Sequence, residues 1–245
     1  MSFPAVPLSS VPVVDRAQMT EVDRLAESMM GLGLIQMMEN AGRALAELVL
    51  TELGPSRIGS APYRVTVLAG TGGNGGGALV AARHLTNRGC EVEVHLSRPP
   101  RTGSVPDRQR TILDAMGVTV TPRPPERADI DAVVDGIIGY SLLGPPTGPA
   151  ADLIGWASAR HTEGTRVVAL DVPSGVDIDT GRAPGVHVSA AATLTLALPK
   201  IGLRDNPAVG RLHLADISIP SAVYEQMGLD VPVLFDRGQI LRLTP

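Results

Sequence analysis

The feature that most constrains the fold is residues 65–84, where six glycines interrupt an apolar stretch. Val65, Val67 and Leu68 predict a buried strand, and the apolar spacing of a helix resumes at about Ala78. The glycines between them let the backbone approach a ligand closely. The free N–H groups at the start of the helix favour a phosphate or a carboxylate. Strand, glycine loop and helix together predict an anion- or nucleotide-binding loop.

Length and composition predict a globular domain. The chain has 245 residues, of which 44% are hydrophobic and 19% are charged, enough for one α/β domain with a full core. We expect a single domain over residues 15–245, preceded by an N-terminal arm over residues 1–14 that is frayed or loosely packed. The arm lacks the basic start and apolar core of a signal peptide.

Charge and cysteine usage narrow the expected partners and location. The formal net charge is −4 and no basic block occurs, which argues against nucleic acid as a partner. No apolar run approaches the ~18 residues of a membrane span. Cys90 is the only cysteine, so a cysteine-built metal site is excluded and a reducing, cytoplasmic location is expected.

Predicted strands and helices alternate through the middle of the chain. Apolar periodicity predicts helices that begin near Thr20 and at about Ala78, and others at 34–53, 107–116 and 150–161. Strands are predicted at 65–68, 90–96, 118–120, 131–139, 166–175, 191–198 and 212–219, and the tail from residue 221 is left unassigned. Continuous apolar strands between helices predict a mainly parallel sheet covered on both faces. Ligands of such folds bind beyond the carboxyl ends of the strands.

The glycine loop does not define an ordinary dehydrogenase. Residues 70–75 fit G-x-G-x-x-G, but this match alone is weak. An NAD-binding fold also needs an acid about 20 residues later for the ribose, and His95, Leu96 and Ser97 occupy that place, followed by Arg98. A P-loop is excluded because no Gly-Lys-Ser/Thr follows the glycines.

Polar residues at the tips of apolar strands predict a site. Asn74, Asp135 and Asp171 end predicted strands or their loops, and Ser174 lies just beyond. Such oxygen donors suit Na⁺, K⁺ or Mg²⁺ rather than zinc, and a desolvated carboxyl can also act as a general acid or base. The alternative is that both aspartates only cap loops. Because two occur beside the glycine loop, we favour a site.

Other polar residues admit structural interpretations. Lys200 follows a strand end and is interpreted as a surface lysine, with an anion contact as the alternative. The run 37–42 predicts either tight helix packing at its glycine or a pocket role for Glu39 or Asn40. Asp177 and Asp179 are predicted to form a turn.

Four segments resemble the YjeF N-terminal domain family of NAD(P)H-hydrate epimerases. They are residues 37–42, residues 69–84, residues 133–139 with Gly144 and Pro145, and residues 169–177 leading to 198–203. The resemblance implies a Rossmann-like three-layer α/β/α sandwich with two N-terminal helices, usually as a homodimer. It implies an isomerase that interconverts the R and S forms of hydrated NADH or NADPH, so that the nucleotide is the substrate and no redox cofactor is needed.

The resemblance also implies roles for individual residues. Asp171 is the expected acid/base residue at the epimerised carbon, and K⁺ is expected at Asn74, Asp135 and Ser174. The substrate-binding residues that it implies are Gly73, Asn74, Gly75, Gly76, Gly77, Gly139, Tyr140, Ser141, Leu142, Leu143, Gly144, Pro145 and Asp171.

This chain departs from the family pattern in the glycine loop. The family loop typically has Asn and Asp where this chain has Gly73 and Gly77, and Ala78 replaces a usual Gly. Tyr140 stands where Thr is frequent. The alternatives are therefore a diverged member acting as an isomerase or cyclase on another small molecule of a biosynthetic pathway, or a non-catalytic binding protein.

Overall fold

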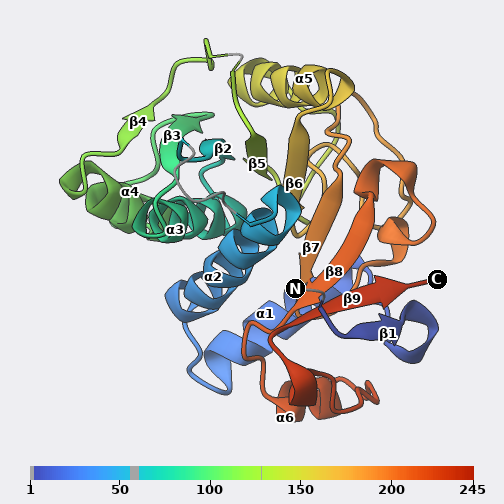
Figure 1. Cartoon of the computed structure of the whole chain (residues 1–245). Helices are drawn as coiled ribbons and strands as arrows, with labels where there is room; N and C mark the ends of the chain where they lie inside the picture. The colour runs from blue at the N-terminus through green and yellow to red at the C-terminus, as the bar shows by residue number, and fades with distance from the viewer. Residues whose placement is uncertain (1–2, 56–60, 128) are drawn as a thin grey trace.

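The computed structural model describes residues 3–55, 61–127 and 129–245. It contains a nine-stranded sheet with the order β1-β9-β8-β7-β6-β5-β2-β3-β4 (Figure 1). Neighbouring strands are parallel except β8 and β9. The strands are β1 (Ala5–Pro7), β2 (Arg64–Ala69), β3 (Glu91–Leu96), β4 (Thr119–Thr121), β5 (Ala132–Gly136), β6 (Arg166–Leu170), β7 (Ala192–Leu196), β8 (Arg211–Ala215) and β9 (Ile240–Thr244).

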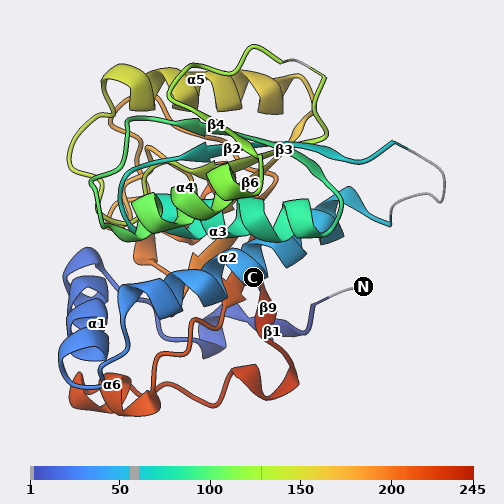
Figure 2. The same cartoon turned by 90° about the vertical axis from the view of Figure 1, so that its left-hand side faces the viewer.

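Helices cover both faces of this sheet. Figure 2 shows α5 on one side and α2, α3 and α4 on the other. The predicted three-layer α/β/α arrangement with a mainly parallel sheet is therefore confirmed. The helices are α1 (Arg16–Ser28), α2 (Leu34–Leu53), α3 (Gly73–Asn87), α4 (Val105–Ala115), α5 (Gly148–Thr162) and α6 (Ser221–Gln226).

The central strands bring their carboxyl ends to one edge of the sheet. β5 lies between β2 and β6, so that Asp135 is in register with Leu68 on one side and Ala169 on the other. β5 and β7 are buried along their whole length, as expected for parallel strands covered on both faces. The loops after β2, β5, β6 and β7 consequently meet at this edge.

Helix α3 begins at Gly73, so the predicted start at about Ala78 is wrong. A Cβ atom on Gly75 would lie 1.9 Å from the carbonyl oxygen of Gly70, and one on Gly77 would lie 2.8 Å from a methyl group of Leu170. Glycine is thus required for the first turns of the helix to pack against the sheet. Tertiary packing overrides the low helix propensity of these residues.

Helix α1 begins at Arg16 rather than near Thr20. The Asp15 carboxylate accepts from the Gln18 amide N–H at 2.8 Å, and the Gln18 side chain accepts from the Asp15 N–H at 3.0 Å. This reciprocal capping box stabilises the first turn and moves the start upstream. The neighbouring helix α2 spans residues 34–53 as predicted.

The N-terminal arm is more ordered than expected. Residues 5–7 form β1, which pairs in parallel with β9 at the edge of the sheet. The expectation of a frayed arm is therefore wrong for these residues, because the unassigned tail supplies β9 as a pairing partner. Whether residue 15 begins a single domain stays a prediction.

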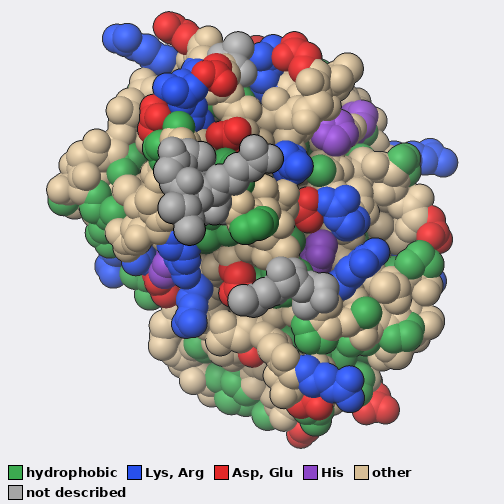
Figure 3. Space-filling model, viewed as in Figure 1, with side chains coloured by type: hydrophobic (Ala, Val, Ile, Leu, Met, Phe, Trp, Pro, Cys, Tyr) green, Lys and Arg blue, Asp and Glu red, His purple; other side chains and the backbone are tan. Residues whose placement is uncertain are grey.

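Two observations describe the surface of the chain. Acidic and basic side chains are interspersed on the face seen in Figure 3. In the part of the chain that the structure describes, no helix has the length and apolar character to cross a membrane.

Candidate active site

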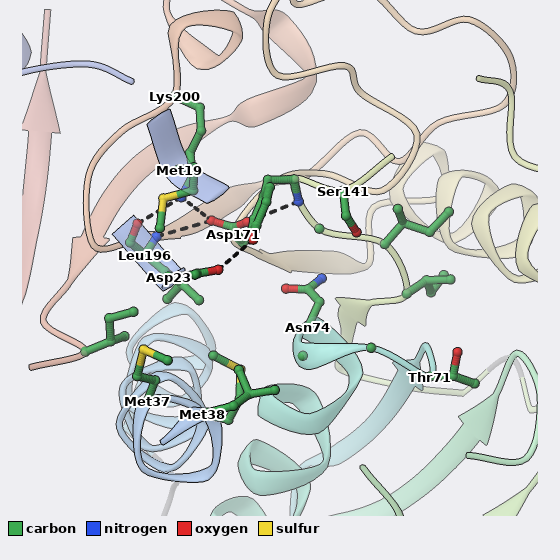
Figure 4. Close-up of a pocket in the computed structure, with 18 of the residues that line it drawn as sticks. Met19, Asp23, Met37, Met38, Thr71, Asn74, Ser141, Asp171, Leu196 and Lys200 are labelled. Atoms are coloured by element: carbon green, nitrogen blue, oxygen red, sulfur yellow. Dashed lines mark hydrogen bonds and ion pairs between the residues drawn. The ribbon is translucent and has the colours of Figure 1, made fainter. Parts of the chain in front are cut away.

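A cavity of about 510 Å³ lies at the carboxyl edge of the sheet, where the loops after β2, β5 and β6 meet α1 and α2 (Figure 4). Its wall is polar on the side of the sheet and largely apolar on the side of the helices, where Met19, Met37 and Met38 line it. A partly closed cavity of this size with a few converging polar groups is typical of a small-molecule site.

Asp171 lies at the tip of β6 in a strained backbone conformation. Its φ is 65°, in the left-handed region that favours glycine. The backbone N–H donates to the Leu194 carbonyl at 2.7 Å, which fixes this turn. The carboxylate is 4% exposed and lines the cavity. A non-glycine residue held in this region costs of order 1–3 kcal/mol and is frequent at active sites.

Lys200 forms a buried ion pair with Asp171. Its ammonium donates to Oδ1 of Asp171, to the Leu196 carbonyl at 2.8 Å and to the Thr195 hydroxyl at 3.2 Å. The side chain is 1% exposed, so the interpretation of a surface lysine is wrong. Burial without these partners would be prohibitively costly for an ammonium.

Both oxygens of the Asp171 carboxylate accept hydrogen bonds. Oδ1 also lies 3.4 Å from the N–H of Leu196, and Oδ2 accepts from the N–H of Tyr140 at 3.3 Å. The carboxylate is thus fixed between β7 and the loop after β5, with one edge toward the cavity. Fixed orientation is what an acid/base group requires.

Asp135 and Ser174 bind each other beneath the cavity. The Asp135 carboxylate accepts from the Ser174 hydroxyl at 2.6 Å and from the Ser174 N–H at 2.8 Å. The same hydroxyl accepts from the N–H of Ile138 at 2.8 Å. Burial raises the pKa of Asp135 to about 6. The pair consequently joins the loops after β5 and β6.

Asn74 lies in the first turn of α3 beside these loops. A Cβ atom on Gly139 would lie 3.2 Å from the Cγ atom of Asn74, so the two residues are close together. The Nδ2 atom of Asn74 is buried with no hydrogen-bond partner in the part of the chain that the structure describes. A 180° rotation of the amide would exchange Nδ2 for an oxygen, which a cation would satisfy. Together with the carboxylate of Asp135 and the hydroxyl of Ser174, this donor set fits a hard alkali cation.

Among residues 3–55, 61–127 and 129–245, no group of three or more His, Cys, Asp or Glu side chains is placed to hold a metal ion.

The structure gathers part of the predicted substrate-binding set around the cavity. The residues of this set that line it are Gly73, Asn74, Gly139, Tyr140, Ser141 and Asp171. Gly75, Gly76 and Gly77 are buried inside α3, and Leu142 is buried. Leu143, Gly144 and Pro145 lie outside the cavity lining, and Leu143 is 87% exposed.

Helix α1 contributes functional candidates that sequence reasoning missed. Met19, Asp23 and Glu27 all line the cavity, and their spacing of four residues places them on one face of the helix. The phenolic hydroxyl of Tyr140 donates to Oδ2 of Asp23 at 2.6 Å. Burial raises the pKa of Asp23. The sequence pattern that could have identified Asp23 is an acidic residue beside the apolar residues that mark the buried face of α1.

Arg16 fixes the loop that carries Tyr140. Its guanidinium donates to the carbonyls of Tyr140 and Leu142, and it forms ion pairs with Asp177 and Asp179. Both aspartates also shape the predicted turn, since Asp177 accepts from the Thr180 and Asp179 N–H groups. The loop, α1 and the turn after β6 are thereby joined at one rim of the cavity.

The run at residues 37–42 has a packing role. A Cβ atom on Gly42 would lie 2.4 Å from the Gly77 carbonyl oxygen, so α2 and α3 make contact at this position. Glu39 pairs with Arg83 and His84 of α3, and Asn40 donates to Ser218 at 2.8 Å. The packing interpretation is confirmed, and the two polar residues connect neighbouring elements.

A mainly parallel sheet with a cavity beyond the carboxyl ends of its strands is typical of Rossmann-like small-molecule-binding proteins. The model of the family described as YjeF-related protein N-terminus matches residues 34–202. The chain belongs to this family.

Named relatives agree with this assignment. The chain is 51% identical over 228 residues to an NAD(P)H-hydrate epimerase of Dehalogenimonas lykanthroporepellens, with 92% of this chain and 90% of the relative covered. It is 38% identical to the bifunctional NAD(P)H-hydrate repair enzyme Nnr of Moorella thermoacetica, and the match covers 85% of this chain and 41% of that longer relative. The crystal structure of yeast YNL200c superimposes with a TM-score of 0.83 at 25% identity, covering 95% of this chain and 100% of the yeast chain.

Proposed function

We propose that this chain is an isomerase that interconverts the R and S epimers of hydrated NADH and NADPH. The observation that carries the proposal is a carboxylate, Asp171, fixed by Lys200 at the wall of a nucleotide-sized cavity. The relative from Dehalogenimonas lykanthroporepellens, named NAD(P)H-hydrate epimerase, matches this chain over nearly its whole length. The nucleotide is the substrate, and no redox cofactor takes part.

The chemistry of inversion explains the need for Asp171. The hydrated ring carries a hydroxyl at the epimerised carbon, so a bond at this carbon must break and re-form on the other face. A fixed carboxylate can accept or return the proton that accompanies this change. Lys200 keeps the carboxylate oriented, and the apolar side chains of Met19 and Met37 exclude water from one side of the cavity.

The cavity also suits the anionic part of a nucleotide. The start of α3 faces it through Gly72 and Gly73, and free N–H groups at a helix start favour phosphate oxygens. Arg98 is the second basic side chain of the lining besides Lys200. Since Lys200 is paired with Asp171, Arg98 is available for the phosphate groups of the substrate.

The proposal includes a K⁺ ion held by Asn74, Asp135 and Ser174. The ion would supply positive charge to the Asp135 carboxylate and an oxygen-binding partner for the Asn74 amide. We expect K⁺ to raise the melting temperature relative to an equal concentration of choline, because an ion bound by the folded state stabilises it. Asp135→Asn should abolish this difference. An equal response of the wild type to both salts would contradict the K⁺ site.

A second candidate function rests on the departures in the glycine loop. A Cβ atom on Gly73 would lie 3.5 Å from the nearest atom, a methyl group of Leu34. A Cβ atom therefore fits there, and its absence in Gly73 leaves the cavity wider on the side of α2. This observation favours a diverged isomerase or cyclase with another small-molecule substrate. We also infer a homodimer and a cytoplasmic location from the family resemblance, which light scattering and cell fractionation test.

The decisive experiment uses a mixture of the R and S forms of hydrated NADH with a separate dehydratase that consumes one epimer. We expect this chain to accelerate consumption of the other epimer. If the wild-type protein leaves that rate at the spontaneous value with hydrated NADH and with hydrated NADPH, the proposed function is wrong and the diverged-substrate alternative is favoured.

A further inference from the structure

Asp23 is the second carboxyl group of the cavity, and it comes from α1 rather than from the sheet. It lies outside residues 34–202 that the family model matches. Figure 4 shows its carboxyl group and that of Asp171 converging at the same end of the cavity. Both residues line the cavity with Lys200.

Tyr140 connects these two carboxyl groups. Its backbone N–H donates to Oδ2 of Asp171 at 3.3 Å, and its hydroxyl donates to Oδ2 of Asp23 at 2.6 Å. Within the described residues, Oδ1 of Asp23 accepts no hydrogen bond from the protein. One oxygen of Asp23 is thus fixed by the loop, and the other remains for a ligand in the cavity.

The surroundings of the two carboxyl groups differ in charge. Asp171 has the Lys200 ammonium in direct contact, which stabilises a carboxylate. Asp23 is partly buried and has no basic side chain within ion-pair distance in the described chain, and burial raises its pKa. Two carboxyl groups of one cavity in such different surroundings can take different parts in proton transfer.

We propose that Asp23 is a second catalytic acid/base residue of this site and acts from the side of α1, while Asp171 acts from the side of the sheet. The inference rests on the proposed epimerase function and extends it. An inversion needs proton transfer where a bond breaks and again where it re-forms. The proposed role of Asp171 supplies one such group, and Asp23 supplies the other.

Asp23 gives its proton to the ring hydroxyl, and the C–O bond breaks with its electron pair on oxygen, so that water leaves. A water molecule then adds to the opposite face of the cationic ring, and its proton passes to the Asp171 carboxylate. In the reverse direction the two residues exchange roles, and proton exchange with solvent restores each of them.

The test is the Asp23→Asn variant in the coupled epimerase assay. We expect kcat to fall at least about 100-fold with little change in KM, because an amide keeps the acceptor for Tyr140 but cannot transfer a proton. Glu21→Gln is the matched control on the same helix, since Glu21 pairs with Arg24, and it should leave kcat unchanged. If the wild type is active and Asp23→Asn retains its kcat, this inference is wrong while the proposed function stands.

A pH profile separates proton transfer from a structural role. The groups that face Asp23 are Tyr140, Lys200, Asp171, Glu27 and Tyr224. The Tyr140 hydroxyl lowers the pKa of Asp23, so Tyr140→Phe should move the alkaline limb of kcat to higher pH. Asp23→Asn should remove the fall of kcat at high pH and keep the fall of kcat at low pH. An alkaline limb unchanged in both variants would overturn the assignment.

Discussion

At the scale of single residues, the Asp171 carboxylate is the group on which the proposed chemistry depends. Asp171→Asn keeps the size of the side chain and removes its ability to accept a proton. We expect the epimerisation rate to fall by about 10²- to 10⁴-fold, the usual contribution of general acid–base catalysis. The coupled assay measures the loss, and circular dichroism checks the fold. A variant that keeps wild-type activity would contradict the role of Asp171.

The ion pair between Lys200 and Asp171 predicts a coupling in stability. Lys200→Met leaves the buried Asp171 carboxylate without its partner, which should destabilise the fold by about 3–5 kcal/mol. The double variant with Asp171→Asn should recover much of this loss, since no charge then remains buried. Urea unfolding of the four proteins in the cycle measures the coupling. Additive losses would show that the two side chains do not interact.

The part of the site that could be predicted from the sequence lies in the glycine loop and at strand ends. Asp135 and Asp171 lie at the ends of apolar strands with Ser174 just beyond, and the parallel order brings them to one edge. The burial of Lys200 was not predicted, because apolar and polar residues alternate within a strand but not after its end. The sequence there does not distinguish an inward-pointing from an outward-pointing side chain. Asp23 was missed because helical spacing marks a face as buried without indicating that a cavity lies against it.

At the scale of elements, the contact between α2 and α3 depends on Gly42. A Cβ atom there would lie 2.4 Å from both the Gly77 carbonyl oxygen and Cβ of Val80. Gly42→Ala should therefore destabilise the protein by about 1–3 kcal/mol, the usual cost of overpacking. Urea unfolding measures the change.

The matched control is Gly155→Ala in α5. A Cβ atom at this position meets nothing within 4 Å, so the higher helix propensity of alanine should leave the stability unchanged or raise it by up to about 1 kcal/mol. If both variants lose equal stability, the close approach of α2 and α3 is not what requires glycine at position 42.

Element types were predicted better than element limits. Helix α2 and the alternation of strands and helices followed from apolar periodicity. The starts of α1 and α3 did not, because they depend on a side-chain cap at Asp15 and on close packing at Gly75 and Gly77. Both are contacts with specific partners, which the spacing of apolar residues does not encode.

At the scale of the whole molecule, stability should fall in mild acid because of His213. This side chain is 4% exposed in β8 and packs edge-to-face with the ring of Phe3. Burial lowers its pKa to about 4. The unfolded chain binds the proton near pH 6.5 and the folded chain only near pH 4, so acid favours the unfolded state in this range.

The stabilisation from neutral His213 is fully present above pH 6.5 and is lost as the pH falls toward 4. The loss should reach about 3 kcal/mol, because each unit of difference between the pKa values of the folded and unfolded states is worth about 1.36 kcal/mol. Urea unfolding of the wild type and His213→Gln between pH 7.5 and 4 measures it. The difference between the two proteins should depend on pH, and a constant difference would contradict the role of His213.

The pairing of β1 with β9 has a consequence for folding during synthesis. Residues 5–7 lie at the edge of the sheet, where β9 is their one neighbouring strand among the described residues. They leave the ribosome before residues 240–244, and β2 to β8 are synthesised between them. β1 can therefore pair with β9 only after all the other strands of the sheet have been synthesised, whereas β2, β3 and β5 can pair much earlier. We expect β1 to stay without its pairing partner until β9 is synthesised, and to dock late in folding.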